Sequence, residues 1–177
     1  MKKKKGFSKF VTGILICLIL LIVGVCLIIA GRGRDEKPSP GPNAKWSVKI
    51  DDKSYKELSG SVKATGFSVD GTKMKYVVPL SSKGDFYQAT IKVVNDGDFD
   101  AKLDSVSIGG LTDEQKKSIQ HTVKFGEYAF LNDAKNVDLF LNAGKSKTIE
   151  IFVLVNEPIN GVNSYTLEFT LNFIKDK

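Results

Sequence analysis

The sequence predicts an all-β fold: an antiparallel β-sandwich of the jelly-roll or Ig-like (immunoglobulin-like) type with one short helix, preceded by an N-terminal transmembrane helix. Three observations lead to this prediction. Apolar and polar residues alternate in many runs beyond residue 45, turn-forming residues separate these runs, and a long uncharged run lies near the amino terminus. Alternation with a period of two is typical of strands that bury one face, and many short strands at such spacing are typical of sandwiches.

The amino-terminal part predicts a membrane anchor. Residues 1–9 are basic, and no charged residue occurs from Phe10 to Ala30. A helix of residues 10–30, rising about 1.5 Å per residue, would be roughly 31 Å long and would match the hydrocarbon core of a bilayer. Lysines that precede a first transmembrane helix stay in the cytoplasm. We therefore expect a cytoplasmic segment 1–9, a single-pass transmembrane helix 10–30 in the cell membrane, and an extracellular carboxy-terminal part.

An uncleaved anchor is favoured over a cleaved leader. Secretory signal peptides have shorter apolar runs that end in small residues, whereas this run ends in Ile28, Ile29 and Ala30. The alternative is a pilin-like subunit cleaved after Gly6, because lysines and a glycine also precede the apolar helix of pilin precursors. Pilins normally carry a glutamate at the fifth residue after the cut, where this chain has Val11.

A linker and an electrically neutral domain follow the anchor. Residues 31–44 are rich in proline and glycine, a composition that favours an extended spacer. Eight of the 26 basic residues and two of the 20 acidic residues precede residue 38, so 18 of each sign remain beyond it. The net charge of +6 therefore belongs to the anchor region. The extracellular domain, residues 45–177, lacks the electrostatic basis for binding nucleic acid.

The predicted sandwich domain begins and ends with clear strands. The first alternates from Trp46 to Asp51, and the last alternates from Tyr165 to Phe173. Each of them presents one apolar face for burial. Alternating or apolar runs between them predict further strands near residues 61–69, 73–79, 86–95, 100–108, 121–126, 137–141 and 147–156.

One helix and one central strand complete the predicted architecture. Thr112 and Gln115 stand at the spacing of a capping box, so we expect a helix over residues 113–120. The strand at 147–156 is apolar on both faces, so we expect it to lie in the middle of a sheet and to be covered on both sides. In the alternative, the apolar residues on its second face form a contact patch.

An aspartate-rich stretch between two predicted strands raises the question of a metal site. Asp96, Asp98 and Asp100 surround Gly97. When the stretch is aligned with the calcium-binding loop of helix-loop-helix proteins, most of the ligand positions are occupied by residues that cannot bind calcium. The Asp-Gly dipeptide instead favours a tight hairpin turn, followed by a bulge where the apolar phase of the second strand slips. A calcium site of another kind, built from Asp96, Asp98 and Asp100, stays open as an alternative.

Several short segments of the domain resemble a known family. They are AKW at 44–46, KGDFY at 83–87, IKVVNDG at 91–97, DAKL at 100–103 and AGKSKTI at 143–149. In this pattern, residues 44–177 resemble bacterial surface domains related to the TasA and camelysin biofilm-matrix family. The resemblance implies a jelly-roll-like β-sandwich that Gram-positive bacteria export and that some members assemble into fibres. The long anchor and the proline-rich spacer depart from that family.

Residues for catalytic chemistry are scarce in the domain. Camelysin-like proteins have been described as metallopeptidases, but a catalytic zinc needs three protein ligands. The domain has one histidine, His121, and no cysteine. A Ser-His-Asp site would need the same histidine, and a lone histidine is expected at the surface or at a helix end. We therefore expect no catalytic residue and no cofactor, and a surface hydrolase that uses His121 is the competing hypothesis.

These observations predict a membrane-anchored extracellular protein without enzymatic activity. We expect it to act in adhesion, envelope structure or biofilm-matrix assembly. Its expected partners are the membrane, through the N-terminal helix, and other surface or matrix proteins or further copies of itself. No nucleic-acid partner is expected.

Overall fold

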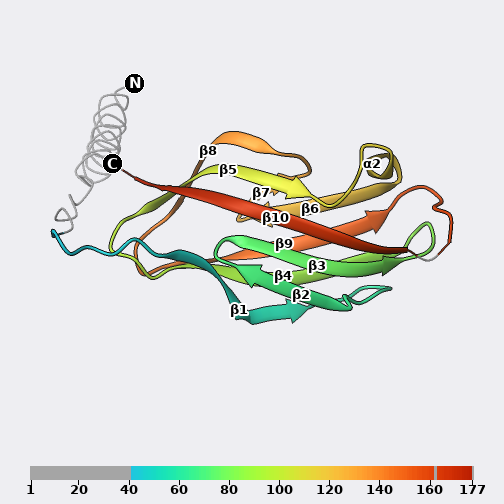
Figure 1. Cartoon of the computed structure of the whole chain (residues 1–177), viewed down its shortest axis with the longest axis horizontal. Helices are drawn as coiled ribbons and strands as arrows, with labels where there is room; N and C mark the ends of the chain where they lie inside the picture. The colour runs from blue at the N-terminus through green and yellow to red at the C-terminus, as the bar shows by residue number, and fades with distance from the viewer. Residues whose placement is uncertain (1–40, 162, 177) are drawn as a thin grey trace, which may run out of the picture. The chain divides into compact units, whose positions relative to one another are not determined.

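The structure is a computed structural model that describes residues 41–161 and 163–176. These residues form two antiparallel sheets and one short helix (Figure 1). The predicted all-β sandwich is thereby confirmed for this part of the chain. The predicted cytoplasmic segment, the transmembrane helix and most of the linker lie outside the described residues. Within the described ranges, no helix is long and apolar enough to cross a bilayer.

Each sheet in the described part of the chain has five strands. The order in the first sheet is β1 (Val48–Glu57), β4 (Phe86–Asn95), β9 (Ser146–Val155), β6 (Ile119–Phe125) and β7 (Tyr128–Phe130). The order in the second sheet is β2 (Gly66–Asp70), β3 (Lys73–Leu80), β10 (Asn163–Lys175), β5 (Ala101–Gly109) and β8 (Ala134–Leu141). The helix α2 (Gln115–Ser118) lies between β5 and β6.

The strands pair in a nested order. β6 pairs with β7, β5 with β8, β4 with β9 and β3 with β10, all antiparallel. Successive strands from β3 to β6 therefore alternate between the two sheets, and the chain returns through the same layers from β7 to β10. Most hydrogen-bonded neighbours are far apart in the sequence as a result.

The core fills the space between the two sheets with the apolar residues of the alternating pattern. β4 and β9 present every second residue to the interior, as the sequence predicts. β10 does the same from the opposite sheet. The buried apolar residues of these three strands are Tyr87, Ala89, Ile91, Val93, Ile149, Ile151, Val153, Val155, Tyr165, Leu167, Phe169 and Leu171.

The loop at 96–100 differs from the predicted hairpin. β4 pairs with β1 and β9, whereas β5 pairs with β10 and β8, so the loop crosses from one sheet to the other. Gly97 also lacks the positive φ of a tight hairpin turn. Glycine is needed here because the backbone of residues 45–47 passes close to Gly97. A Cβ at this position would lie 2.7 Å from the Ser47 nitrogen and 2.8 Å from the Lys45 oxygen. The bulge expected in β5 is confirmed, because the register shifts around Asp104.

Several element boundaries also differ from the prediction. β1 continues to Glu57, and its pairing register with β4 shifts between Asp51 and Lys56. Because of this shift, the second half of the strand does not continue the alternation of apolar and polar residues that predicted the first half. The strand predicted near residues 61–69 begins only at Gly66, so residues 61–65 precede β2. β7 was not predicted, because its three residues carry no alternating pattern. The helix is shorter than 113–120, because Ile119 and the residue after it already pair with β9.

The central strand β9 lies between β4 and β6, as predicted, but only one of its faces is fully covered. Phe152 and Leu154 point away from the core and are half-buried. The Phe152 ring lies 6.4 Å from the ring of Phe86, measured between centroids. The prediction of a strand covered on both sides is therefore wrong for the outer face.

Candidate functional site

The aspartates of the 96–100 loop each have a structural partner. Asp96 forms an ion pair with Lys49 at 2.9 Å. The Asp98 carboxylate accepts a hydrogen bond of 2.7 Å from the Lys45 backbone, and the Asp98 N–H donates one of 2.9 Å to the Lys45 carbonyl. Asp100 accepts a hydrogen bond of 2.7 Å from the backbone of Ala143. The three carboxylates thus contact two segments of the chain, residues 45–49 and the turn that contains Ala143.

These aspartates do not come together as a metal site in the structure. Among the described residues, no group of three or more His, Cys, Asp or Glu side chains is placed to hold a metal ion. The buried residue that organises the loop is Asn95, which the sequence did not single out. Its amide donates to the carbonyls of Phe99 at 2.8 Å and Leu141 at 2.9 Å, and its Oδ1 accepts from the Gly97 N–H at 3.1 Å. All of these bonds serve the fold, as buried amides require.

Calcium is expected to leave the melting temperature of the protein unchanged, because the carboxylates of the loop already have partners. The variant Asp98→Asn keeps an oxygen that can accept from the Lys45 backbone, so it should cost less than about 0.5 kcal/mol of unfolding free energy. Thermal unfolding with and without millimolar calcium measures both effects. A bound ion would instead stabilise the protein by about 2.7 kcal/mol at a hundredfold excess over its dissociation constant. Such a rise, lost in Asp98→Asn, would contradict this expectation.

His121 lies in the core and not at the surface, which corrects the sequence-based expectation. It belongs to β6, where it points inward together with Val123 and Phe125, and only 4% of its surface is exposed. Its Nε2 forms a hydrogen bond of 2.5 Å with the hydroxyl of Tyr76, which comes from the opposite sheet. The two rings meet edge to face. The alternation of β6 was the signal that could have placed this residue inside.

The environment of His121 keeps its imidazole neutral. Burial lowers the pKa of His121 to about 4, and the nearby backbone of Gly109 opposes this shift. Within residues 41–161 and 163–176, however, the Nδ1 atom has no partner at hydrogen-bond distance and angle. The Gly109 backbone therefore lies close enough to oppose the effect of burial on the pKa of His121, although it forms no well-aligned hydrogen bond with Nδ1. Burial also raises the pKa of Tyr76 well above its usual value, so its hydroxyl stays protonated and can donate to Nε2.

The protein is expected to lose about 2 kcal/mol of unfolding free energy between pH 7.5 and pH 5 because of His121. In the unfolded chain this histidine takes up a proton near pH 6.5, whereas in the folded protein its pKa is about 4. Unfolding is therefore accompanied by proton uptake in this window, and stability falls as the pH falls. Urea unfolding at several pH values measures the slope.

The matched variant for this measurement is His121→Phe, which removes the titrating group and keeps a ring of similar size. Its unfolding free energy should be nearly independent of pH between 7.5 and 5. The carboxylates of Asp85 and Glu168 also have lowered pKa values, but their contribution is lost only at lower pH. An equal slope in the two proteins would contradict the role of His121.

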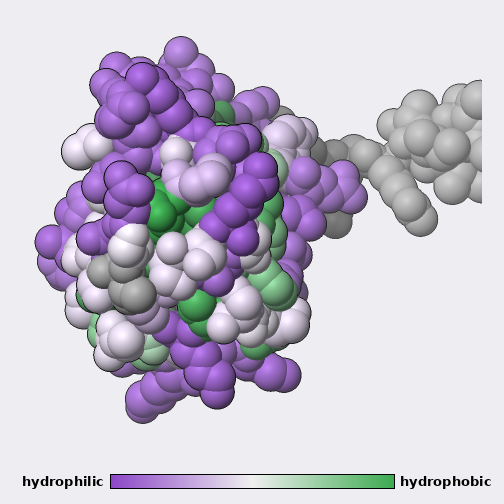
Figure 2. Space-filling view, turned by 90° about the vertical axis from the view of Figure 1, so that its right-hand side faces the viewer, coloured by the Kyte–Doolittle hydropathy of each residue, from purple (hydrophilic) through white to green (hydrophobic). Residues whose placement is uncertain are grey.

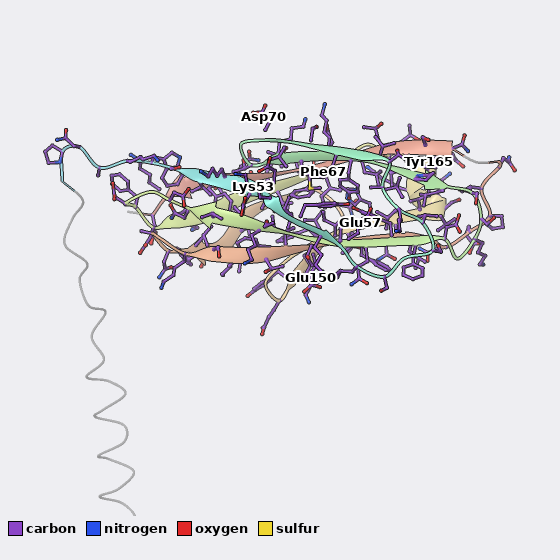
Figure 3. All side chains as sticks on the ribbon, turned by 90° about the horizontal axis from the view of Figure 1, so that it is seen from below. Lys53, Glu57, Phe67, Asp70, Glu150 and Tyr165 are labelled. Carbon is purple, nitrogen blue, oxygen red and sulfur yellow. The ribbon has the colours of Figure 1, made fainter. Side chains whose placement is uncertain are left out.

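Aromatic side chains close the side of the sandwich formed by the edge strands β1 and β2. Phe67 and Glu57 lie on this side of the sandwich (Figure 3). The Phe67 ring stacks on that of Tyr55, with centroids 4.2 Å apart. The Tyr87 hydroxyl lies 2.7 Å from that of Tyr55, which donates to Glu57 at 3.1 Å. Glu57 also accepts from the Ala64 backbone at 2.8 Å. This carboxylate is therefore held by structural bonds.

A pocket of about 230 Å³ opens at the end of the sandwich that carries α2. It lies between the end of β5, the helix, the start of β6 and the segment after β7. Figure 2 looks onto this end and shows hydrophobic surface surrounded by hydrophilic residues. The aliphatic residues that line the pocket are Ile108, Leu111, Ile119 and Leu131. Leu131 is 49% exposed.

The polar lining of the pocket contains amides, one lysine and His121. The amide side chains are Gln120, Asn132 and Asn156, and the lysine is Lys116 of α2. Among the described lining residues there is no Ser, Thr, Cys, Asp or Glu. A hydrolytic site needs a nucleophile or a carboxylate base beside its histidine. Among the described residues that line the pocket, His121 therefore has no nucleophile and no carboxylate base beside it. The sequence could not reveal the pocket, because its residues come from four separate segments.

The comparisons with known proteins do not identify a family. No protein-family model matches the chain, and no curated protein matches it.

Proposed function

We propose that the chain is a tethered surface protein that binds or supports other molecules and is not an enzyme. In this proposal, residues 10–30 anchor it in the cell membrane, and the sandwich acts outside the cell in adhesion, envelope structure or matrix assembly. The anchor rests on the uncharged run from Phe10 to Ala30, whose length suits a bilayer.

The observation that carries the non-enzymatic part of this proposal is the placement of His121. The chain has one histidine. Its Nε2 is bonded to Tyr76, it is 4% exposed, and burial lowers its pKa to about 4. A general base works best with a pKa near the operating pH and within reach of the substrate. His121 meets neither condition, and the described residues that line its pocket include no Ser, Thr or Cys nucleophile.

The architecture agrees with the resemblance to the TasA and camelysin surface domains. We place the sandwich in the jelly-roll class, because the nested pairing of β3 with β10, β4 with β9, β5 with β8 and β6 with β7 matches the double Greek key of that class. β1 and β2 extend the two sheets at one side. Fold alone does not assign function, so the surface role rests on the anchor and the chemistry of the domain.

Two assays test the proposal separately. Incubation of the purified protein with peptide and glycan substrates should give no hydrolysis beyond the rate of the His121→Gln variant. Hydrolysis that this substitution abolishes would overturn the non-enzymatic assignment. Protease added to intact, wall-stripped cells should release a fragment that begins within residues 37–43. Full protection of the carboxy-terminal domain would overturn the extracellular placement.

A further inference from the structure

We propose that the pocket beside α2 binds a small carboxylate that carries a compact aliphatic group. This goes beyond the surface role, because it names a ligand site and the chemistry of the ligand. The argument rests on the size of the pocket, the sign of its charge and the donors on its wall.

The size and walls of the pocket define the apolar half of the ligand. A cavity of about 150 Å³ lined by aliphatic and aromatic residues accepts a benzene-sized molecule, so 230 Å³ has room for a branched chain and a small polar head. The walls formed by Ile108, Leu111, Ile119 and Leu131 are aliphatic. An aliphatic group of four or five carbons would thus cover this surface and displace water from it, which is the main source of affinity in such sites.

The charge of the pocket defines the polar half of the ligand. Among the described residues that line it, Lys116 is the only charged one. Its ammonium group pairs with Asp113 at 3.2 Å, but that carboxylate is fully exposed and does not line the pocket. The side-chain amides of Asn132 and Asn156 add donors that suit a carboxylate. An anion is therefore favoured, because no carboxylate is among the described residues that line the pocket.

His121 also belongs to the residues that line the pocket. The Tyr76 hydroxyl lies at its Nε2, and the backbone of Gly109 lies near the ring. Both contacts suit the tautomer in which Nδ1 carries the proton, since Tyr76 then donates to Nε2. Nδ1 has no hydrogen-bond partner among residues 41–161 and 163–176, although the side chain is more than nine-tenths buried. Because Nδ1 is itself buried, His121 shapes the wall of the pocket, and the polar contacts to a ligand fall to Lys116, Asn132 and Asn156.

The experiment is a titration of the full-length, isotope-labelled chain in detergent micelles with 4-methylpentanoate, followed by nuclear magnetic resonance. Signals of the Asn132 and Asn156 side-chain amides and of the Gly109 backbone should shift together with a dissociation constant on the order of 1 mM. The backbone signal of Gly144, at the opposite end of the sandwich, should stay in place. The absence of shifts at tens of millimolar would overturn the proposal.

Two pairs of variants separate the pocket from its surroundings. Lys116→Gln should weaken binding about three- to tenfold, whereas Lys117→Gln on the same helix, whose lysine pairs with Glu114, should leave it unchanged. Leu131→Glu should abolish binding by placing a negative charge at the pocket, and Leu58→Glu, at a comparably exposed leucine elsewhere, should have no effect. Equal effects within either pair would overturn the assignment.

The ligand itself is varied to test its two halves and its source. Acetate, which lacks the aliphatic group, and 4-methylpentanamide, which lacks the charge, should each bind at least threefold more weakly. Equal binding of the amide would overturn the anionic assignment. N-acetyl-leucine imitates the carboxy-terminal residue of a peptide. Tighter binding of N-acetyl-leucine assigns the site to the carboxy-terminal ends of peptides. Tighter binding of 4-methylpentanoate assigns it to free short-chain acids. Both results support the proposed chemistry.

Discussion

Replacement of Gly110 by alanine is expected to lower the free energy of unfolding by about 4 kcal/mol. Gly110 follows β5 with a φ of 97°, a conformation that favours glycine. A Cβ at this position would lie 2.2 Å from the Thr166 carbonyl oxygen and 2.7 Å from the Leu167 Cα. Both atoms belong to the backbone of β10, which lies between β3 and β5 and cannot move aside without disturbing both pairings.

Urea unfolding followed by the fluorescence of Trp46, the one tryptophan of the chain, measures this effect. The matched control is Gly126→Ala. Gly126 also has a positive φ, of 63°, but a Cβ there meets no atom within 4 Å. The control should therefore show only the backbone penalty, roughly 1 to 2 kcal/mol. Equal losses in the two variants would show that the close approach to β10 is not the cause.

Phe169→Ala is expected to cost roughly 3 to 5 kcal/mol of unfolding free energy. Phe169 lies in the middle of β10 with no exposed surface, so the substitution leaves a cavity between the sheets. A loss of this size is a large share of the stability of a typical domain. The same urea titration measures it, and the midpoint should move while the slope stays the same.

The control for this variant is Phe67→Ala on the edge strand β2. Phe67 is 41% exposed and contacts the Tyr55 ring. Its removal loses the stacking on Tyr55 and the burial of part of one ring, and should cost about 1 to 2 kcal/mol. A small loss at Phe169, similar to that at Phe67, would mean that the inward face of β10 is assigned incorrectly.

Local sequence patterns predicted the strands and their buried faces well, because alternation records which side chains meet the core. The phase slip between Leu103 and Val106 even revealed the bulge in β5. The same patterns say nothing about which strand pairs with which. Asp96-Gly97 has the composition of a hairpin turn, but β4 and β5 each find better partners far along the chain, so the loop crosses between the sheets.

The candidate site was predicted less well than the fold. His121 was noticed as the one histidine, but its burial depends on the strand phase of β6 and on Tyr76, which is 45 residues away. The helix prediction also ran through Ile119 and Gln120, because their pairing with β9 is a tertiary effect that outweighs the local helix signal. The pocket joins Leu111, Leu131 and Asn156 from separate loops, and no local pattern contains such a set.

The paired hydrogen bonds between Lys45 and Asp98 have a mechanical consequence. They lie where the chain enters the sandwich, at the end opposite α2 (Figure 1). β1 runs from this entry towards the α2 end and pairs with β4 alone in its sheet. Tension on the chain ahead of residue 41, balanced by a load held at the α2 end, would act along the axis of β1. The bonds between β1 and β4 would then share the force in shear, and the strand would resist being peeled away one bond at a time.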